Sequence, residues 1–439
     1  MNLKTMSIKH FTVLLLLLAG AGYSFGNTID SSTTQTEQMD IGQIKNSNYF
    51  YQIADQKRVV FLGEEDHKVA EFNQLKTQII NNYRAREPRV LLLFESAVDA
   101  AFYGFRDNMN SFLWPDSSTK IFPLWINAET EDLLIPSQPG HSFLIGGIDP
   151  QHLDDFYEDY QKTSFFRHFQ SSHFWSDSFN NRLLQLDAIR FSLIKKRGSL
   201  YTLTKKATIA PKEDSLAAFK NYTSDCKQLL ADYKRLLENL PVANTVNEKI
   251  DRLVVLNRPW EIEVSIAMAD YSRSRNEMMA RNLTYLADSV FADWKIIVWA
   301  HDGHVLKQTL HDPITEVKAT IGTYLSKSFM DESAVFLLKT NRHILNDGTA
   351  LNKTKIASSE TVHQYMAAGN ENQFFSPIID ASLWSKQFKR CYWDTNIYKC
   401  NYRLSDVCDG IFYLKDTHTP HFQSRYMRER RPADGKKAD

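Results

Sequence analysis

The sequence predicts an α/β fold in which a mainly parallel central sheet is flanked by helices and carries a large helical insertion. Four short apolar runs, at 58–62, 89–94, 143–148 and 295–299, have the length and branching of buried strands. The runs are continuous rather than alternating, as a parallel sheet covered on both faces requires. A long stretch of helical patterns between the third and fourth runs predicts the insertion, at about residues 152–291.

The segment between the first two runs supports a parallel arrangement. Apolar residues at spacings of three and four over residues 69–87 predict an amphipathic helix. A strand, a helix and a second strand in this order form the crossover unit of α/β folds. Inside the insertion, helical patterns run over 214–240 and 261–291, and prolines interrupt them. Two further strands are expected after the insertion, at 334–338 and 410–414.

The N-terminal residues 1–26 have the pattern of a secretory signal peptide. Lys4 and Lys9 form a basic start, an apolar run follows at 11–20, and small residues come next. We therefore expect an exported protein, periplasmic or secreted, without stable membrane insertion, because no second run reaches the ~20 apolar residues of a membrane span. We expect a loose lead-in at 27–45, one domain at 46–420 and a flexible tail at 421–439.

The composition excludes several classes of protein. The 439 residues carry 52 Lys and Arg against 52 Asp and Glu, so the formal net charge is zero. A nucleic-acid-binding protein usually shows a basic excess, so nucleic acid is not an expected partner. Hydrophobic residues make up 43% and charged residues 24%, which is ordinary for a globular chain and argues against dominant disorder.

The four cysteines predict a disulfide rather than a metal site. Cys391, Cys400 and Cys408 lie close together, whereas Cys226 is distant in sequence. Their spacing does not match the close pairs of a zinc site, and an exported protein can form disulfides. We expect one disulfide among the three neighbours, with Cys226 either free or paired with the remaining one.

Polar residues with useful chemistry follow each of the four apolar runs. They are Glu64 and His67 after the first run, Glu95 after the second, Asp149 and Gln151 after the third, and His301 and His304 after the fourth. Ligands of α/β folds bind at the carboxyl ends of the strands, so we expect these side chains to form one cluster. Any one of them alone has a structural explanation; Asp66, for example, is placed to cap the next helix.

The chemistry that this cluster predicts is general base catalysis. A histidine held by a carboxylate can take a proton from water near neutral pH. The sequence has no Gly-x-Ser-x-Gly elbow for a serine nucleophile, so direct attack by water is favoured over a covalent mechanism. Glu64-x-x-His67 and His301-x-x-His304 also have spacings compatible with metal ligands. The helical His-Glu-x-x-His signature is absent, and no metal or other cofactor is expected.

At these residues the chain resembles the erythromycin esterase family. The family's Gly-Glu-x-x-His segment is matched at 63–67, and the glutamate that ends its second strand is matched by Glu95. Its Trp-Ala-His-x-x-His block is matched at 299–304, which is the most specific part of the resemblance. Other blocks match at 275–283 and 322–325, and the resemblance covers most of the mature chain in order.

The resemblance implies a hydrolase that opens an ester with an activated water, either independent of a metal or with a metal requirement that the resemblance leaves open. It implies that His67 is the general base and that Glu64 and Glu95 orient this base or bind the water. Three further residues would contact the substrate carbonyl or the developing oxyanion, namely His301, His304 and Arg275.

The resemblance also implies a set of substrate-binding residues. They are Lys76, Trp125, Glu129, Asp149 and Gln151. The chain departs from the family beside the first histidine, where Asp66 and Lys68 replace a threonine and a glycine, and on the next helix, where Lys76 replaces an arginine. Because these changes border the site, a macrolide substrate does not follow from the resemblance.

The sequence thus predicts an exported hydrolase of the erythromycin esterase type, acting on a small-molecule ester or lactone. Two alternatives use the same cluster differently. In the first, a non-catalytic or metal-binding module employs the histidines and glutamates as ligands. In the second, the chain binds a substrate that it does not turn over.

Overall fold

The structure is a computed structural model of the chain. It describes residues 40–106, 125, 127–134, 142–152, 159–172, 175–206, 213–267, 271–309, 319–345, 348–352, 366, 372–377, 387–393 and 396–420. The described residues all belong to one compact unit, Met39–Asp439. The predicted signal peptide, most of the predicted lead-in and the predicted tail lie outside the described residues.

Ten strands are described. They are β1 (Val59–Glu64), β2 (Arg89–Ala97), β3 (Ser142–Asp149), β4 (Lys295–His301), β5 (Ser333–Ile344), β6 (Ala350–Asn352), β7 (Gln373–Pro377), β8 (Gln387–Trp393), β9 (Asn396–Arg403) and β10 (Gly410–His418). The helices are α2 (Asn48–Ala54), α3 (Ala70–Arg86), α4 (Val98–Arg106), α5 (Ser164–Ser171), α6 (Asp177–Lys206), α7 (Glu213–Glu238), α8 (Val246–Asn257), α9 (Trp260–Ala267), α10 (Tyr271–Tyr285), α11 (Asp302–Val305), α12 (Ile321–Tyr324), α13 (Lys327–Asp331) and α17 (Leu404–Val407). Shorter turns are η1 (Ile41–Gln43), η4 (Ala128–Leu134), η6 (Tyr160–Lys162) and the π-helical η7 (Leu286–Val290).

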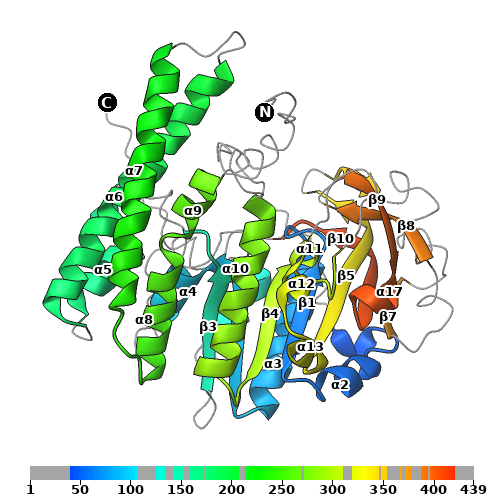
Figure 1. The fold of residues 1–439 in the computed structure, drawn as a ribbon. Helices are drawn as coiled ribbons and strands as arrows, with labels where there is room; N and C mark the ends of the chain where they lie inside the picture. The colour runs from blue at the N-terminus through cyan, green and yellow to red at the C-terminus, as the bar shows by residue number, and fades with distance from the viewer. Residues whose placement is uncertain are drawn as a thin grey trace, which may run out of the picture. The chain divides into compact units, whose positions relative to one another are not determined.

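The central sheet confirms the predicted α/β fold (Figure 1). Its strand order is β3-β2-β4-β1-β5-β10-β7, and β6 pairs with β5. The pairs from β3 to β10 are parallel, whereas β7 and β6 pair antiparallel with their neighbours. The four predicted apolar runs therefore form four adjacent strands. In the described part of the chain, β8 and β9 form a separate antiparallel pair.

Both faces of the sheet are covered, as the continuous apolar runs require. Along β1, Val59 and Phe61 enter one hydrophobic core, and Val60 and Leu62 enter the other. The first core contains residues of α10, and the second contains residues of α3. In Figure 1, α10 accordingly lies in front of the sheet and α3 behind it. This alternation places every residue of β1 in a buried environment.

The predicted helical insertion is helical, and buried charges connect it to α4, the helix that follows β2. It contains α5 to α9, and α6 packs against α7 (Figure 1). Arg258, which caps α8 and is fully buried, donates to Asp187 on α6 and to Asp99 on α4, each at 2.7 Å. The predicted helical stretch at 261–291 corresponds to α9, α10 and η7. Because α10 packs on β3, it also belongs to the layer that covers the sheet.

Two glycines allow the strand ends to approach their neighbours closely. A Cβ atom on Gly147 of β3 would lie 2.2 Å from the carbonyl oxygen of Ser96, where the register of β2 shifts. A Cβ atom on Gly63 of β1 would lie 2.6 Å from Val305 in α11. Glycine at these positions therefore allows β3 to approach β2 and β1 to approach α11 closely.

The cysteines are described only in part. Cys226 and Cys408 are free thiols, and both are buried. Cys226 is therefore free, as one form of the prediction required, and Cys408 is excluded from a disulfide. The side chains of Cys391 and Cys400 lie outside the described ones, so a disulfide between them stays a prediction. Among the helices that the structure describes, none combines the length and the apolar character that a membrane span needs.

Candidate active site

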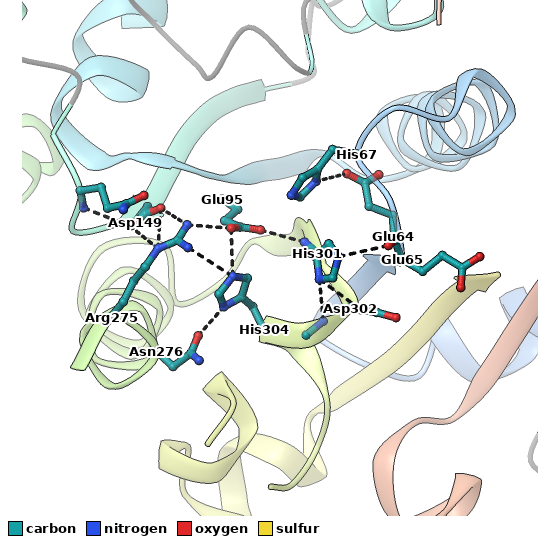
Figure 2. A network of polar contacts seen from close by, with 12 residues as sticks. Glu64, Glu65, His67, Glu95, Asp149, Arg275, Asn276, His301, Asp302 and His304 are labelled. Carbon is teal, nitrogen blue, oxygen red and sulfur yellow. Dashed lines mark hydrogen bonds and ion pairs between the residues drawn. The ribbon is translucent and has the colours of Figure 1, made fainter. Parts of the chain in front are cut away.

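Carboxylates and histidines from four adjacent strand ends meet at one edge of the sheet (Figure 2). Glu64, Asp149 and His301 are the last residues of β1, β3 and β4, and Glu95 lies where β2 shifts register. We call the whole set the polar cluster; it consists of Glu64, His67, Glu95, Asp149, Arg275, His301 and His304. The sequence predicted that all of these except Arg275 meet at one sheet edge, whereas Arg275 was inferred from the resemblance; the structure brings all of them together.

Glu64 is held by four hydrogen-bond donors. His67 Nδ1 and Lys76 Nζ each lie 2.8 Å from its oxygens, and the indole nitrogens of Trp125 and Trp299 lie at 3.1 Å. Its side chain is fully buried. Burial would raise the pKa of Glu64, but the charge of Lys76 and the bond from His67 outweigh it and lower the pKa to about 2. Glu64 is therefore an ionised carboxylate with both oxygens occupied, which suits it to hold other groups in place.

His67 has one ring nitrogen held and the other open. Its Nδ1 contacts Glu64, whereas no residue in the described ranges forms a hydrogen bond with its Nε2. The side chain is 23% exposed, and the ring lies edge-on to Trp125 and His301, with centroids 5.5 and 5.1 Å away. Burial lowers the pKa of His67, but the bond to Glu64 and the charge of Glu95 outweigh it, so the pKa is raised.

Arg275 joins two carboxylates at the other end of the cluster, as Figure 2 shows. Its Nη2 donates to Glu95 at 2.7 Å, and its Nε lies 3.1 Å from both oxygens of Asp149. Glu95 also accepts from the backbone N–H of His301 at 2.8 Å. Burial would raise the pKa of Glu95, but the charges of His304 and Arg275 hold it well below its usual range. This end of the cluster is therefore a fixed ion-pair network.

The other two histidines have both ring nitrogens occupied. In His304, Nδ1 lies 2.5 Å from Oδ1 of Asn276, and Nε2 lies 3.0 Å from Glu95. In His301, Nδ1 accepts from the backbone N–H of Gly303 at 3.1 Å, so Nε2 carries the proton and donates to the carbonyl of Glu65 at 3.1 Å. Burial lowers the pKa of His301, which favours its neutral form.

The residues predicted to bind substrate have different environments. Lys76 and Trp125 have exposed fractions of 0% and 1%, and both donate to Glu64 from inside the protein. Asp149 is also fully buried and pairs with Arg275. Gln151 is half-buried and its backbone N–H donates to Asp149, and Glu129 is half-buried in η4. Substrate contact therefore stays a prediction for all five residues, while the burial of Lys76, Trp125 and Asp149 favours a supporting role for these three.

Several residues of the site were missed. Trp299 and Asn276 lie within segments that the sequence singled out, yet their roles as donor to Glu64 and partner of His304 are visible only in three dimensions. Lys339 follows the predicted strand at 334–338, so the rule that polar residues follow apolar runs could have found it. Within the described residues, no three His, Cys, Asp or Glu side chains are arranged to hold a metal ion.

Comparisons with known proteins agree with the family resemblance that the sequence motifs indicate. The family model described as Erythromycin esterase matches residues 203–417, which include Arg275, His301 and His304. A curated relative named "Putative hydrolase YbfO", of Bacillus subtilis (strain 168), is 23% identical over 297 residues. The match covers 60% of this chain and 60% of that relative, so it spans less than two thirds of the relative's length.

Solved structures share the fold. A succinoglycan biosynthesis protein superimposes with a TM-score of 0.63 at 11% identity, covering 85% of this chain and 92% of that one. A protein from Bacillus cereus gives 0.54 at 15% identity, with coverages of 86% and 92%. A mutant of the erythromycin esterase EreC, in an open conformation, gives 0.52 at 15% identity, with coverages of 88% and 96%. The family match over residues 203–417, together with this shared fold, confirms the resemblance to the erythromycin esterase family that the motifs indicated.

Proposed function

We propose that this chain is a hydrolase that cleaves a carboxylic ester or a lactone by direct attack of a water molecule activated by His67. The observation that carries the proposal is the state of the three clustered histidines. Of these three, only His67 has a ring nitrogen without a partner among the described residues, and its side chain is 23% exposed. It is therefore the histidine that can exchange a proton with a bound water.

The contacts of His67 define the proton movements. Because Glu64 is ionised and accepts from Nδ1, the lone pair of the neutral ring is on Nε2. Nε2 takes a proton from the water while the water oxygen attacks the substrate carbonyl. The resulting imidazolium is stabilised by Glu64, and also by the charge of Glu95. The same proton then passes to the leaving alkoxide as its bond to the carbonyl carbon breaks, which yields a carboxylic acid and an alcohol.

The developing oxyanion needs donors that are fixed before the reaction begins. Arg275 and His304 meet this need, because the carboxylates and Asn276 hold them in place and their side chains are still 12% and 15% exposed. A preorganised donor of this kind typically contributes a factor of ~10²–10³ in turnover. We therefore assign oxyanion stabilisation to this pair. His301 is assigned a structural role, since its single ring proton is already donated to the carbonyl of Glu65 and its side chain is only 9% exposed, less than those of Arg275 and His304.

The test compares turnover with stability in one set of variants. Purified protein is screened against a panel of carboxylic esters and lactones, and His67→Ala is then measured on the best substrate. We expect turnover to fall by a factor of ~10²–10⁴, the usual contribution of a general base, while the melting temperature stays near that of the wild type. The matched control is His418→Ala, which removes a 42% exposed histidine paired with Glu71 outside the polar cluster.

Two outcomes would contradict the proposal. Full activity combined with a lower melting temperature in His67→Ala would make His67 a structural residue. Binding of an ester without any hydrolysis by the wild type would favour the alternative of a binding protein without turnover. A metal-dependent alternative is tested by metal analysis of the purified protein and by activity after dialysis against a chelator.

We also propose that the protein is exported to the periplasm or secreted and acts there on a small-molecule ester or lactone. The support is the basic start, the apolar run and the small residues within positions 1–26. N-terminal sequencing of protein recovered from the extracytoplasmic fraction should find a mature chain that starts near Asn27. Recovery of the unprocessed chain from the cytoplasm would refute the proposal.

A further inference from the structure

A second buried lysine–carboxylate pair lies next to His301. Lys339 on β5 donates to Oδ2 of Asp302, the residue that follows His301 in the chain. The Lys339 nitrogen also lies 3.6 Å from Oε2 of Glu65. The side chains of Lys339 and Asp302 are only 7% and 5% exposed. The sequence motifs do not assign a role to Lys339.

The two oxygens of Asp302 have different surroundings. Oδ2 accepts from Lys339, whereas Oδ1 is buried and has no hydrogen-bond partner in the part of the chain that the structure describes. Oδ1 nevertheless lies 3.1 Å from Nδ1 of His301. That nitrogen accepts from the N–H of Gly303 and therefore has no proton for Asp302. Oδ1 of Asp302 thus faces the lone pair on Nδ1 of a neutral imidazole. If the charge of Asp302 were not balanced, it would favour a second proton on the ring, and the two residues would then form an ion pair.

We propose that Lys339 is a positioning residue that, through its ion pair with Asp302, keeps His301 neutral and so leaves His67 able to take up a proton. The two imidazole rings have centroids 5.1 Å apart, so two cations there would repel each other strongly. With Lys339 present, the charge of Asp302 is balanced and His301 has no need of a second proton. The consequence for turnover rests on the proposed function, whereas the charge state of His301 does not.

The other charged groups around the two rings do not replace Lys339. His301 is faced by Asp302 and His304 on α11, by Glu95 from β2 and by His67. His67 is faced by Glu64, Glu95 and Asp66. The cations Arg275 and Lys76 are already paired with Glu95 and Glu64. Lys339 is thus the cation that directly contacts Asp302 in the described structure.

The experiment measures the protonation of the histidines directly. Full-length mature protein labelled with ¹³C at the histidine Cε1 position is titrated by NMR, and the resonances are assigned with His67→Gln and His301→Gln variants. In the wild type, His301 should be neutral at pH 7. In Lys339→Met it should become protonated near neutral pH, and the titration midpoint of His67 should fall by about two pH units, the size expected for a unit charge ~5 Å away in a partly buried site.

Two further variants separate charge from structure. Asp302→Asn removes the carboxylate that could draw a proton onto His301 and leaves Lys339 facing Glu65, so His301 should stay neutral at pH 7 and the midpoint of His67 should not show the fall expected in Lys339→Met. In the Asp302→Asn, Lys339→Met double variant, no charge remains unbalanced at this pair, and both midpoints should return to wild-type values. Unchanged midpoints in Lys339→Met would overturn the proposal.

A second measurement keeps the proposal testable if Lys339→Met does not fold. A cationic His301 in the wild type at pH 7 would overturn it without any variant. On the hydrolysed substrate, the acid limb of the pH profile of kcat/KM should move to lower pH in Lys339→Met and return in the double variant. If no substrate is hydrolysed by the wild type, the proposed function fails, and the NMR titrations still decide the role of Lys339.

Discussion

Replacing Glu64 with glutamine should separate the stability of the site from its activity. Glu64 is fully buried and accepts from His67, Lys76, Trp125 and Trp299. A carboxamide of the same shape has one accepting oxygen, and its NH₂ group would face donors. The substitution also leaves Lys76, whose side chain has no exposed area, without its counter-charge.

The magnitude follows from the two pKa shifts of the pair. The pKa of Glu64 falls from 4.5 to about 2, which corresponds to about 3 kcal/mol in favour of the ionised form. Burial lowers the pKa of Lys76 from 10.5 to about 8 despite the charge of Glu64, a cost of similar size. The intact pair is therefore close to neutral for stability. Removing one partner leaves an uncompensated buried charge, which typically costs ~3–5 kcal/mol.

A double variant provides the matched control. Glu64→Gln combined with Lys76→Met removes both charges, so its free energy of unfolding should be higher than that of Glu64→Gln alone. Turnover should not recover in the double variant, because both variants lack the carboxylate that accepts a hydrogen bond from Nδ1 of His67. We expect turnover to be lost to a similar extent in both, by a factor of about 10² or more.

The assay is urea unfolding of the wild type and both variants, with turnover measured on the same samples. The reasoning fails if the double variant is less stable than Glu64→Gln, since the cost would then come from lost packing and not from an unpaired charge. It also fails if Glu64→Gln retains full turnover, because Glu64 would then not orient the base.

Two further predictions concern pH and the cysteines. Since the pKa of His67 is raised above 6.5, kcat/KM should be high above the raised value and fall as the pH drops through it, because Nε2 then carries a proton; a profile without an acid limb above pH 6.5 would contradict this. Mass spectrometry of unreduced, alkylated protein should find Cys391 linked to Cys400, while Cys226 and Cys408 react as free thiols after unfolding; four alkylated cysteines would exclude the disulfide.

The layered fold could be predicted because burial on both faces leaves a direct trace in the sequence. Along β1, adjacent residues enter opposite cores, so a strand of this sheet must be apolar without interruption. The polar residues that follow such strands could be located for the same reason, because a parallel sheet gathers the carboxyl ends of its strands. The short strands β6 and β7 do not have this continuous apolar pattern, since they pair antiparallel at the margins of the sheet.

The burial of Lys76 was also readable from the sequence, although its role was predicted differently. Lys76 lies on α3 between Phe72 and Ile79, at the spacing of the apolar face. A lysine at this position must either reach solvent or pair with a buried carboxylate. In the structure it pairs with Glu64 at 2.8 Å. Substrate contact was inferred from the resemblance alone, and the position of Lys76 on the apolar face of the helix was not used.

The different roles of the three histidines could not be predicted from the sequence. They depend on hydrogen bonds that form only in the folded chain. His301 and His304 are three residues apart, yet one uses Nδ1 to accept from a backbone N–H and the other directs Nδ1 at a side-chain amide oxygen. The orientation of that amide is fixed in turn, since Nδ2 of Asn276 donates to the carbonyl of Ala319 at 2.7 Å. No spacing rule in the sequence distinguishes these arrangements.

The polar cluster and the residues that support it contain a histidine, a carboxylate and a lysine twice, with opposite consequences for charge. His67 directs an N–H at Glu64, which is balanced by Lys76, and His301 directs a lone pair at Asp302, which is balanced by Lys339. A carboxylate that accepts an N–H favours the imidazolium, whereas a carboxylate that faces a lone pair, with its charge balanced, leaves the ring neutral. Two imidazolium ions with ring centroids 5.1 Å apart would suppress each other's protonation. The hydrogen bond from Gly303, by fixing where the proton of His301 lies, therefore helps to determine that His67 is the ring that ionises.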